Sequence, residues 1–330
     1  MCIRDKPNST VQILLWNARA LHHHSPEHRL AKMRIIRREL HPARPVFTIV
    51  MIQETHGTLP KLYHLLSFAR STHHFFHSPF PRVDSPNRTD EHTGGLLMLI
   101  PDPLNRIKRS SHCTHYQLHP GRIQNVVIKY QKQTRSFWNV HNFDIPTHIM
   151  FVACNAIRKD LRADRDSPLN HSTFAGGDWN FHAIGERATQ IPTSEHPTIL
   201  TPDRALSADH KSWISALSLA SEFSSDSPTH FNSGRSTLRR NHRLYSGIPT
   251  RMLVQIQVGT RTLCNPISYA QRFISDHVPI VYTFRYTHGR GARLAPIPTF
   301  VTRHPQSVSY THLRAHETSL HLVCRLLLEK

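Results

Sequence analysis

The apolar residues near the start of the chain fall into segments with different spacings. Val11–Trp16 is a short, mostly apolar run that ends in Asn17, which makes it a candidate for a buried strand. Ser25-Pro26-Glu27 then supplies a helix N-cap, a first-turn proline and an early acid, before Pro42 and Pro45 end the segment. Its apolar residues follow at helical spacing: Leu30, Met33, Ile36 and Leu40. With a further apolar run at Phe47–Ile52, the order strand, helix, strand predicts a layered α/β domain.

Further apolar segments continue to about Tyr286. We predict strands at Gly95–Ile100, Gln124–Tyr130, Phe137–Phe143, Thr173–Gly176, Arg251–Val258 and Val278–Phe284. Helices are predicted over Ile149–Leu161 and Ala208–Phe223, and polar, proline-bearing loops over Pro81–His92 and Asp164–Asn170. The pattern contains no internal repeat and does not indicate a second folded domain.

The two ends differ from the part between them. Met1–Asp5 and the blocks Val308–Thr318 and Leu322–Glu329 resemble translated sequencing adapter. We therefore expect four parts: residues 1–9 as an artefactual or disordered leader, 10–287 as the folded domain, 288–307 as an unstructured tail and 308–330 as an adapter-derived artefact.

Charge adds a functional indication. Lys and Arg outnumber Asp and Glu by 41 to 22, which gives a net charge of +19. A basic chain of this kind favours a polyanionic partner, because neutralised phosphates supply most non-specific affinity for nucleic acids. The alternative is drift in a chain that is no longer selected for function, and the 38% hydrophobic content is low enough to keep this alternative open.

Histidine and cysteine usage is unusual but gives no metal motif by spacing. The run His22-His23-His24 lacks neighbouring Cys or carboxylate ligands, so a solvated loop is the better interpretation. The 5 cysteines form no CxxC pair, which fits a reducing compartment. Without a secretory or membrane-spanning segment, we expect an intracellular protein, nuclear or cytoplasmic, that has no membrane partner.

Polar residues recur where predicted strands end. Asn17 follows the first strand, Glu54 the second and Asp178 a later one, and Asp276-His277 precede the last. Carboxylate and amide oxygens gathered at one rim of a sheet suit Mg²⁺, which keeps several waters for a phosphate substrate. A histidine nearby can accept a proton from water near neutral pH.

In this order the motifs resemble the endonuclease/exonuclease/phosphatase superfamily, which includes the DNase I-like nucleases and the apurinic endonucleases. The chain looks most like the endonuclease domains of non-LTR retrotransposons. The matching pieces are Leu14–Asn17, Ile52–His56, Gly94–Leu97, Val140–Asn142, Gly176–Asn180 and Ser275–Pro279. The resemblance implies a four-layer α/β sandwich, in which two packed sheets are flanked by helices, with residues 10–287 as the catalytic domain.

The resemblance also implies a metal site. Glu54 would be the principal metal-binding carboxylate, Asn17 would bind metal or phosphate beside it, and Asp276 would be a second metal ligand. The ion would be Mg²⁺, with Mn²⁺ as the alternative.

Four further residues take catalytic roles by the same resemblance. Asp178 would orient or deprotonate the attacking water, and Asn180 would hydrogen-bond the developing phosphorane. His277 would act as general base or phosphate contact, and His141 stands where the family has a phosphate-binding His or Tyr.

One motif departs from the family pattern. Family members carry an Arg-Ile-Asp-like motif whose Asp hydrogen-bonds the catalytic His, and its best counterpart is Thr250–Leu253, with Leu253 at the Asp position. An analogous loss in a catalytic triad costs about 10⁴-fold in turnover. Residues 234–250, which are rich in Arg, Asn and His, leave another alignment open.

The leading hypothesis is therefore a Mg²⁺-dependent DNA endonuclease. One alternative keeps the fold but changes the substrate, to that of an RNA deadenylase or a phosphoinositide or sphingolipid phosphatase. The other is a catalytically dead remnant that still binds nucleic acid.

Overall fold

The computed structural model describes residues 10–40, 46–80, 94–101, 113–130, 133–167, 170–180, 189–190, 208–223, 225, 227–232, 237–247, 256–263, 272 and 274–286. Contacts divide the chain into Met1–Thr287 and His288–Lys330, and all described residues belong to the first unit. The predicted leader, the tail, the adapter-like end and the predicted loop Pro81–His92 lie outside the described residues.

The described elements are mostly strands, with helices between some of them. The strands are β1 (Thr10–Asn17), β2 (Val46–Gln53), β3 (His73–Ser78), β4 (Leu96–Pro101), β5 (Cys113–His119), β6 (Ile123–Tyr130), β7 (Gln133–His141), β8 (His171–Asp178), β9 (Thr189–Gln190), β10 (Ser221–Phe223), β11 (His230–Asn232), β12 (Thr237–Arg239), β13 (His242–Ser246), β14 (Ile256–Thr262) and β15 (Ile280–Tyr286). The helices are α1 (Pro26–Glu39), α2 (Leu59–Leu65), α3 (Thr147–Asp166) and α4 (Ala208–Leu217), with a 3-10 turn at Ser67–Ala69.

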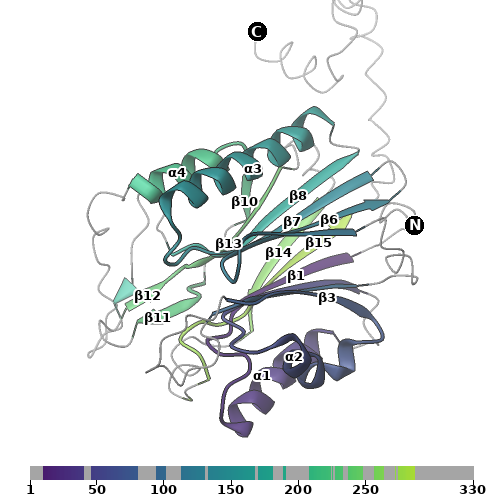
Figure 1. Cartoon of the computed structure of the whole chain (residues 1–330), viewed down its shortest axis with the longest axis vertical. Coiled ribbons are helices and arrows are strands. Elements are labelled where there is room, and N and C mark those ends of the chain that lie inside the picture. The colour runs from purple at the N-terminus through teal and green to yellow at the C-terminus, as the bar shows by residue number, and fades with distance from the viewer. Residues whose placement is uncertain are drawn as a thin grey trace, which may run out of the picture. The chain divides into compact units, whose positions relative to one another are not determined.

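Two six-stranded mixed sheets form the centre of the fold. The first has the order β14-β15-β1-β2-β4-β3 and the second the order β10-β13-β8-β7-β6-β5, while β11-β12-β9 form a small third sheet. In the two large sheets β1 runs parallel to β2 and β7 parallel to β8, and the other pairs are antiparallel. Helices α3 and α4 cover the outer face of the second sheet, and α1 and α2 cover that of the first (Figure 1). The four-layer α/β sandwich is confirmed.

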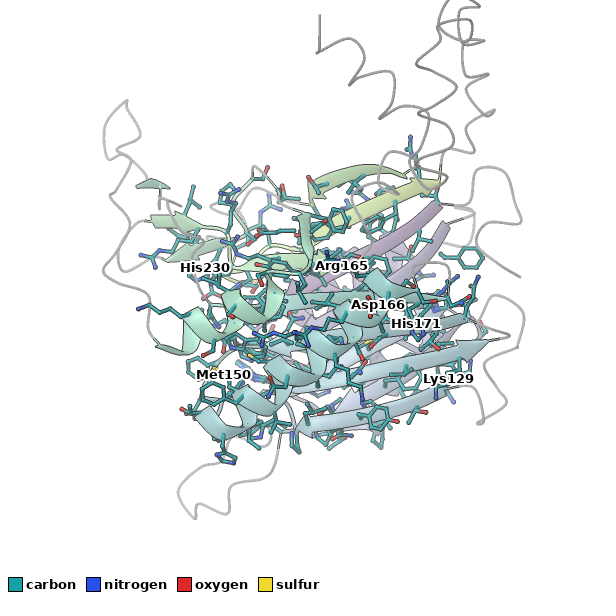
Figure 2. All side chains as sticks on the ribbon, turned by 90° about the horizontal axis from the view of Figure 1, so that it is seen from above. Lys129, Met150, Arg165, Asp166, His171 and His230 are labelled. Carbon is teal, nitrogen blue, oxygen red and sulfur yellow. The ribbon has the colours of Figure 1, made fainter. Side chains whose placement is uncertain are left out.

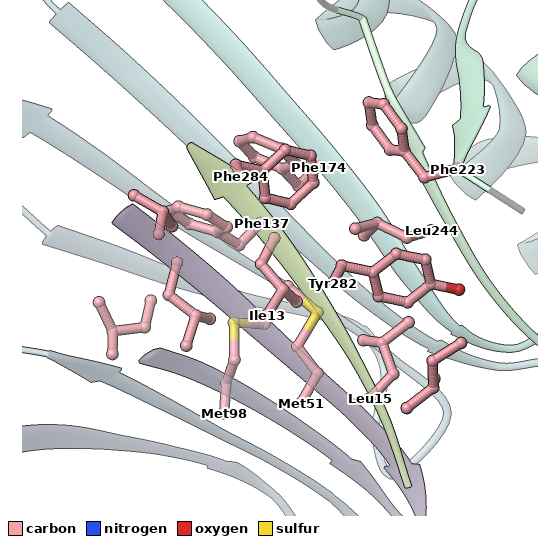
Figure 3. Packing of buried hydrophobic residues seen from close by; sticks show 14 of the residues in the cluster. Ile13, Leu15, Met51, Met98, Phe137, Phe174, Phe223, Leu244, Tyr282 and Phe284 are labelled. Atoms are coloured by element: carbon pink, nitrogen blue, oxygen red, sulfur yellow. The ribbon is translucent and has the colours of Figure 1, made fainter. Parts of the chain in front are cut away.

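The apolar residues Ile13–Trp16 of β1 are explained by burial on both faces. Ile13 and Leu15 point into the cluster between the two sheets, where Met51, Phe137 and Phe174 also lie (Figure 3). Leu14 and Trp16 point the other way, into a second cluster under α1 and α2. A central strand therefore needs apolar residues at successive positions rather than at alternate ones.

The predicted start of α1 is confirmed. Ser25 caps the helix, its Oγ accepting from the His28 N–H at 3.5 Å, and Pro26 is the first helical residue. The helix ends at Glu39, before the prolines of residues 41–45.

Several predicted boundaries are wrong, and one of them is the end of the strand predicted at Arg251–Val258, since β14 continues to Thr262. The strand expected to reach Phe143 ends at His141. The helix predicted over Ala208–Phe223 ends at Leu217, and its last residues form β10, because Phe223 packs between the sheets. The loop predicted at Asp164–Asn170 begins late: α3 continues to Asp166, since the Asp164 carboxylate accepts from the Thr173 N–H at 2.6 Å and hydroxyl at 2.8 Å.

No helix among the described residues is long and apolar enough to cross a membrane.

A buried lysine supports the loop that follows β1. The Lys32 ammonium lies under this loop and donates to the carbonyls of Ala18, Arg19 and Ala20 at 2.7, 2.8 and 2.8 Å. Three ammonium hydrogens thus meet three acceptors. Arg19 and Ala20 both have positive φ, at 40° and 65°, so the loop needs this support.

We expect Lys32→Met to lower the free energy of unfolding by about 3 kcal/mol, because three carbonyls lose a charged donor. Denaturant unfolding of the full chain measures this change. The matched control is Lys159→Met on an exposed part of α3, which should stay within about 0.5 kcal/mol of the parent. Equal stability of the two variants would contradict the supporting role.

Candidate active site

The predicted site residues lie where strands of both large sheets end. In the parallel pair β1–β2, Asn17 stands beside Gln53, so Glu54 follows directly at the same edge. In the parallel pair β7–β8, His141 stands beside Asp178. The loop before β15 adds Asp276 and His277.

Two of these residues have an unfavourable backbone conformation. Glu54 has φ 54° and Asn180 has φ 49°, both in the left-handed region that residues with a side chain rarely adopt. The Glu54 carbonyl accepts from the N–H groups of Ala20 and Leu21, at 2.9 and 3.2 Å, which holds the turn after β2 in this conformation. Strain of this kind often marks functional positions.

Asn17 connects the two sheets. Its Nδ2 group donates to Glu54 Oε1 at 2.8 Å and to Asp178 Oδ2 at 2.9 Å, and its own Oδ1 accepts from the Arg19 N–H at 3.0 Å. Asn17 belongs to the first sheet and Asp178 to the second. One buried amide therefore sets the spacing of two carboxylates that come from different sheets.

Glu54 stays ionised despite its burial. Burial raises the pKa of its carboxyl, but the hydrogen bonds from His56 and Asn17, together with the attraction of His141 and His277 in their protonated forms, bring the pKa below the usual value. The side chain is 24% exposed, so a solvent ion can reach it.

His141 has a defined tautomer. Arg122 Nη1 donates to His141 Nδ1 at 2.8 Å, so this nitrogen must be an unprotonated acceptor. Burial lowers the pKa of His141 to about 4, and the neutral ring therefore carries its hydrogen on Nε2. That nitrogen lies 3.4 Å from Glu54 Oε1, so His141 presents a neutral donor toward the Glu54 carboxylate and cannot accept a proton there.

Asp178 and His277 face each other. His277 Nδ1 lies 3.5 Å from Asp178 Oδ2. Burial raises the pKa of Asp178, but the potentials of His277, His242 and His141 and the Asn17 hydrogen bond outweigh this and lower it. The backbone of His277 is held in place as well, since its carbonyl accepts from Trp16 Nε1 at 3.1 Å and its N–H donates to Ser275 Oγ at 3.1 Å.

Asn180 is held at both ends of its amide. Its Oδ1 accepts from Asn241 Nδ2 at 3.2 Å, and its Nδ2 donates to the Asn142 carbonyl at 3.2 Å. An amide nitrogen carries two hydrogens, and among the described residues Asn180 Nδ2 has one acceptor, the Asn142 carbonyl. One N–H can therefore face a ligand.

Asp276 lies at the border of the site. Its Oδ2 accepts from Arg19 Nη1 at 2.7 Å and lies 3.9 Å from His230 Nε2, while its Oδ1 lies 3.8 Å from His277 Nε2. A continuous chain of contacts thus connects all the predicted site residues: Asn17, Glu54, His141, Asp178, Asn180, Asp276 and His277. Their individual roles stay predictions.

The position of the departing motif cannot be read from Leu253, which lies outside the described residues together with the rest of 248–255. The strand next to β8 is β13, and its first residue, His242, pairs directly with Asp178. The His242 ring centroid lies 5.1 Å from that of His277. A histidine from the alternative region 234–250 therefore occupies this place beside His277. Burial lowers the pKa of His242 to about 3, so it adds no positive charge to the site at neutral pH.

Several residues of the site escaped the sequence analysis: Lys32, Arg122, His230, His242 and Asn241. None follows a strand in one of the matching motifs. In the sequence, Arg122 could have been found from the Gly121-Arg122 turn before β6. His242 could have been found as a histidine within residues 234–250, the region that left another alignment open.

The donor set fits a hard divalent cation. Glu54 and Asp178 are ionised, their oxygens converge on one amide, and Glu54 is reachable from solvent. Mg²⁺ prefers one or two carboxylates and keeps its other positions for water and phosphate.

The comparisons with known proteins agree with this arrangement. The model of the Endonuclease/Exonuclease/phosphatase family matches residues 14–277, well over half of the 330 residues. No curated protein sequence matches the chain.

The solved structures to which the chain is similar have low sequence identity. Truncated Caenorhabditis elegans TDP2 is 14% identical, with a TM-score of 0.47 and coverage of 83% of this chain and 97% of that one. D. rerio TDP2 complexed with single-strand DNA product is 12% identical, with a TM-score of 0.47 and coverage of 84% and 99%. The endonuclease domain of TRAS1, a telomere-specific non-LTR retrotransposon, is 15% identical, with a TM-score of 0.44 and coverage of 85% and 100%. The family match spans the segment that carries the site, from β1 to His277, and so the chain belongs to the endonuclease/exonuclease/phosphatase family of phosphodiester hydrolases.

Proposed function

We propose that the chain is a Mg²⁺-dependent DNA endonuclease of the retrotransposon type. The observation that carries the proposal is the Asn17 amide, which donates to Glu54 at 2.8 Å and to Asp178 at 2.9 Å. Hydrolysis of a phosphodiester needs an electrophilic contact to the phosphoryl oxygens and an oriented water. The amide holds one carboxylate for each requirement.

Glu54 would hold the ion, with Asn17 fixing the carboxylate in place. When bound, Mg²⁺ supplies Lewis-acid polarisation of the phosphoryl oxygen. Ionised Glu54 fits this role because no proton has to leave before the ion binds.

Asp178 and His277 would act on the water. Buried Asp178 is ionised, and its Oδ2 lies 3.5 Å from His277 Nδ1, so the carboxylate can orient the imidazole while its other oxygen orients the water. The His277 imidazole would accept the proton through Nε2.

His141 and Asn180 would be donors to the phosphate. Arg122 fixes the His141 tautomer with hydrogen on Nε2, and Asn180 has a second amide hydrogen besides the one donated to the Asn142 carbonyl. Neutral donors aimed at the phosphoryl oxygens stabilise the charge that develops there.

The net charge supports nucleic acid as the substrate class. A charge of +19 favours a polymer with many phosphates over a lipid headgroup with few. The catalytically dead, nucleic-acid-binding remnant remains the second candidate, favoured by His242 at the place beside His277, where the family pattern calls for an Asp.

The test is nicking of supercoiled plasmid by the full chain with Mg²⁺, with Mn²⁺ and with EDTA. We expect nicking with either ion and none with EDTA, and Glu54→Gln should lower the rate by about 10²-fold or more, because the ion loses its charged ligand. Glu27→Gln is the control, since Glu27 is exposed on α1. Plasmid binding without nicking would identify the remnant, and cleavage of RNA or phosphoinositide in place of DNA would identify a same-fold alternative.

A further inference from the structure

A second group of metal-ligand side chains lies beside the proposed Mg²⁺ site. It consists of His230, Asp276 and His277, called here the histidine–aspartate cluster. One ligand atom from each lies within 4.8 Å of the others. His230 projects from β11 at the end of the sheets where β8 finishes, and Lys129 and His171 mark the opposite end (Figure 2).

The backbone holds the cluster in register. The Phe231 N–H donates to the Asp276 carbonyl at 2.8 Å, the Val278 N–H donates to the Thr229 carbonyl at 2.9 Å, and His230 and His277 form an antiparallel bridge. The two ring centroids lie 4.4 Å apart. The two imidazoles and the carboxylate are thus brought together by main-chain bonds, before any ligand arrives.

One carboxylate oxygen of the cluster is buried without a partner. Among the described residues, Asp276 Oδ1 has no hydrogen-bond partner. A buried carboxylate oxygen left unpaired is unfavourable and calls for an explanation. A cation bound by Asp276 Oδ1 and the imidazoles would satisfy the carboxylate oxygen directly.

We propose that His230, Asp276 and His277 bind a divalent transition-metal ion of the Zn²⁺ class, at a site separate from that of Glu54. Two imidazoles with one carboxylate suit Zn²⁺ or Co²⁺, whereas Mg²⁺ prefers oxygen ligands alone. The ligands are His230 Nε2, Asp276 Oδ1 and His277 Nε2, and the fourth position is open to water. This set matches catalytic-type zinc sites, which use three protein ligands.

The distance between the His277 and Asp276 ligand atoms fits after a small closure. His277 Nε2 lies 3.8 Å from Asp276 Oδ1, and bonds of ~2.0 Å in tetrahedral geometry place ligand atoms roughly 3.3 Å apart. The Asp276 and His230 side chains are 28% and 16% exposed and can make this movement. Arg19, which is 64% exposed, is paired with Asp276 Oδ2 and leaves Oδ1 for the ion.

Asp178 provides the supporting contact that such sites use. A metal on His277 Nε2 leaves the hydrogen on Nδ1, and this nitrogen lies 3.5 Å from Asp178 Oδ2. A carboxylate behind a metal-bound histidine fixes the tautomer and orients the ring. Bound Zn²⁺ would also occupy the lone pair of His277 Nε2, so it should inhibit hydrolysis. This inhibition rests on the proposed function, whereas the metal site does not.

The experiment is a titration of the metal-free full chain with Co²⁺, followed by its visible absorption and then by displacement with Zn²⁺. Because the chain has 28 histidines, Co²⁺ binding at the cluster is separated from binding at other histidines by the variants. His230→Gln and Asp276→Asn should each weaken Co²⁺ binding by about 10²-fold, because a ligand is lost. His23→Gln is the control, taken from the other histidine group, where His23 lies 4.0 Å from His24 and 4.7 Å from His28 between ring centroids. It should leave the spectrum unchanged.

Circular dichroism of each variant shows whether it is folded, and two variants are used so that one unfolded protein does not decide the result. The proposal is overturned if the parent gives no tetrahedral Co²⁺ spectrum, or if a folded His230→Gln or Asp276→Asn protein keeps it. Because the Co²⁺ spectrum does not depend on DNA cleavage, the metal site can be tested even if the chain has no nuclease activity.

Discussion

Replacing Asp178 by asparagine is expected to lower Mg²⁺-dependent DNA cleavage by about 10³- to 10⁴-fold, comparable to the loss of an orienting carboxylate in a catalytic triad. The substitution keeps the shape of the side chain but removes the charge that faces His277 Nδ1 at 3.5 Å. It also replaces an acceptor of the Asn17 amide, 2.9 Å away, by a group that can present a competing donor. Single-turnover nicking of plasmid measures the effect on the chemical step.

The control for this result is Asp166→Asn at the exposed end of α3, which should cleave at the parent rate. A folded Asp178→Asn protein with more than about a tenth of the parent rate would contradict the role of Asp178 in orienting the water. Equal losses in both variants would instead indicate a general effect of the removed charge, whereas unchanged rates in both would indicate a contaminating nuclease.

Gly177→Ala is expected to lower the free energy of unfolding by about 3 kcal/mol or more, because strain and overpacking add at one position. Gly177 has φ 154°, and a Cβ atom there would overlap the Val140 carbonyl of the neighbouring strand β7. The backbone of β7 cannot move away without breaking its parallel pairing with β8, which places His141 beside Asp178. Thermal or denaturant unfolding measures the loss.

Gly259→Ala on β14 is the matched control, since a Cβ there meets nothing within 4 Å. An alanine at this position should be neutral or slightly stabilising, because it restricts the unfolded chain. If Gly177→Ala were as stable as Gly259→Ala, the close approach of β7 and β8 at this point would be wrong.

The sequence predicted the parts of the fold that have long or regular patterns. β1, α1 and β2 were found within one or two residues, because each combines a strong apolar pattern with a clear end signal: Asn17, Ser25-Pro26 and Gln53-Glu54. The contacts among the site residues were expected for a related reason, since strand ends gather at one edge, but these strands belong to two sheets and not to one.

Short and exposed elements could not be predicted in the same way. β11 has three residues and a sequence, His-Phe-Asn, without apolar alternation, yet it places His230 against Asp276 and His277. β13 begins at His242, within residues 234–250, and it forms because β8, which is distant in the chain, pairs with it. β11 pairs with the nearby β12, but its bridge to His277 is distant, and local propensity carries no record of distant partners.

The Asn17 amide has a consequence for how the molecule responds to change elsewhere. It reaches from one sheet to a carboxylate of the other, and near it Gly176 allows Leu15 to approach across the core, where a Cβ would lie 2.8 Å from the leucine methyl. The distance between the Glu54 and Asp178 carboxylates therefore changes whenever one sheet slides against the other, since the two residues belong to different sheets. A core substitution that shifts this alignment by a fraction of an ångström can silence the site while the protein stays folded. Among homologous chains, side-chain volumes at the interface between the two sheets should then change in compensating pairs rather than one at a time.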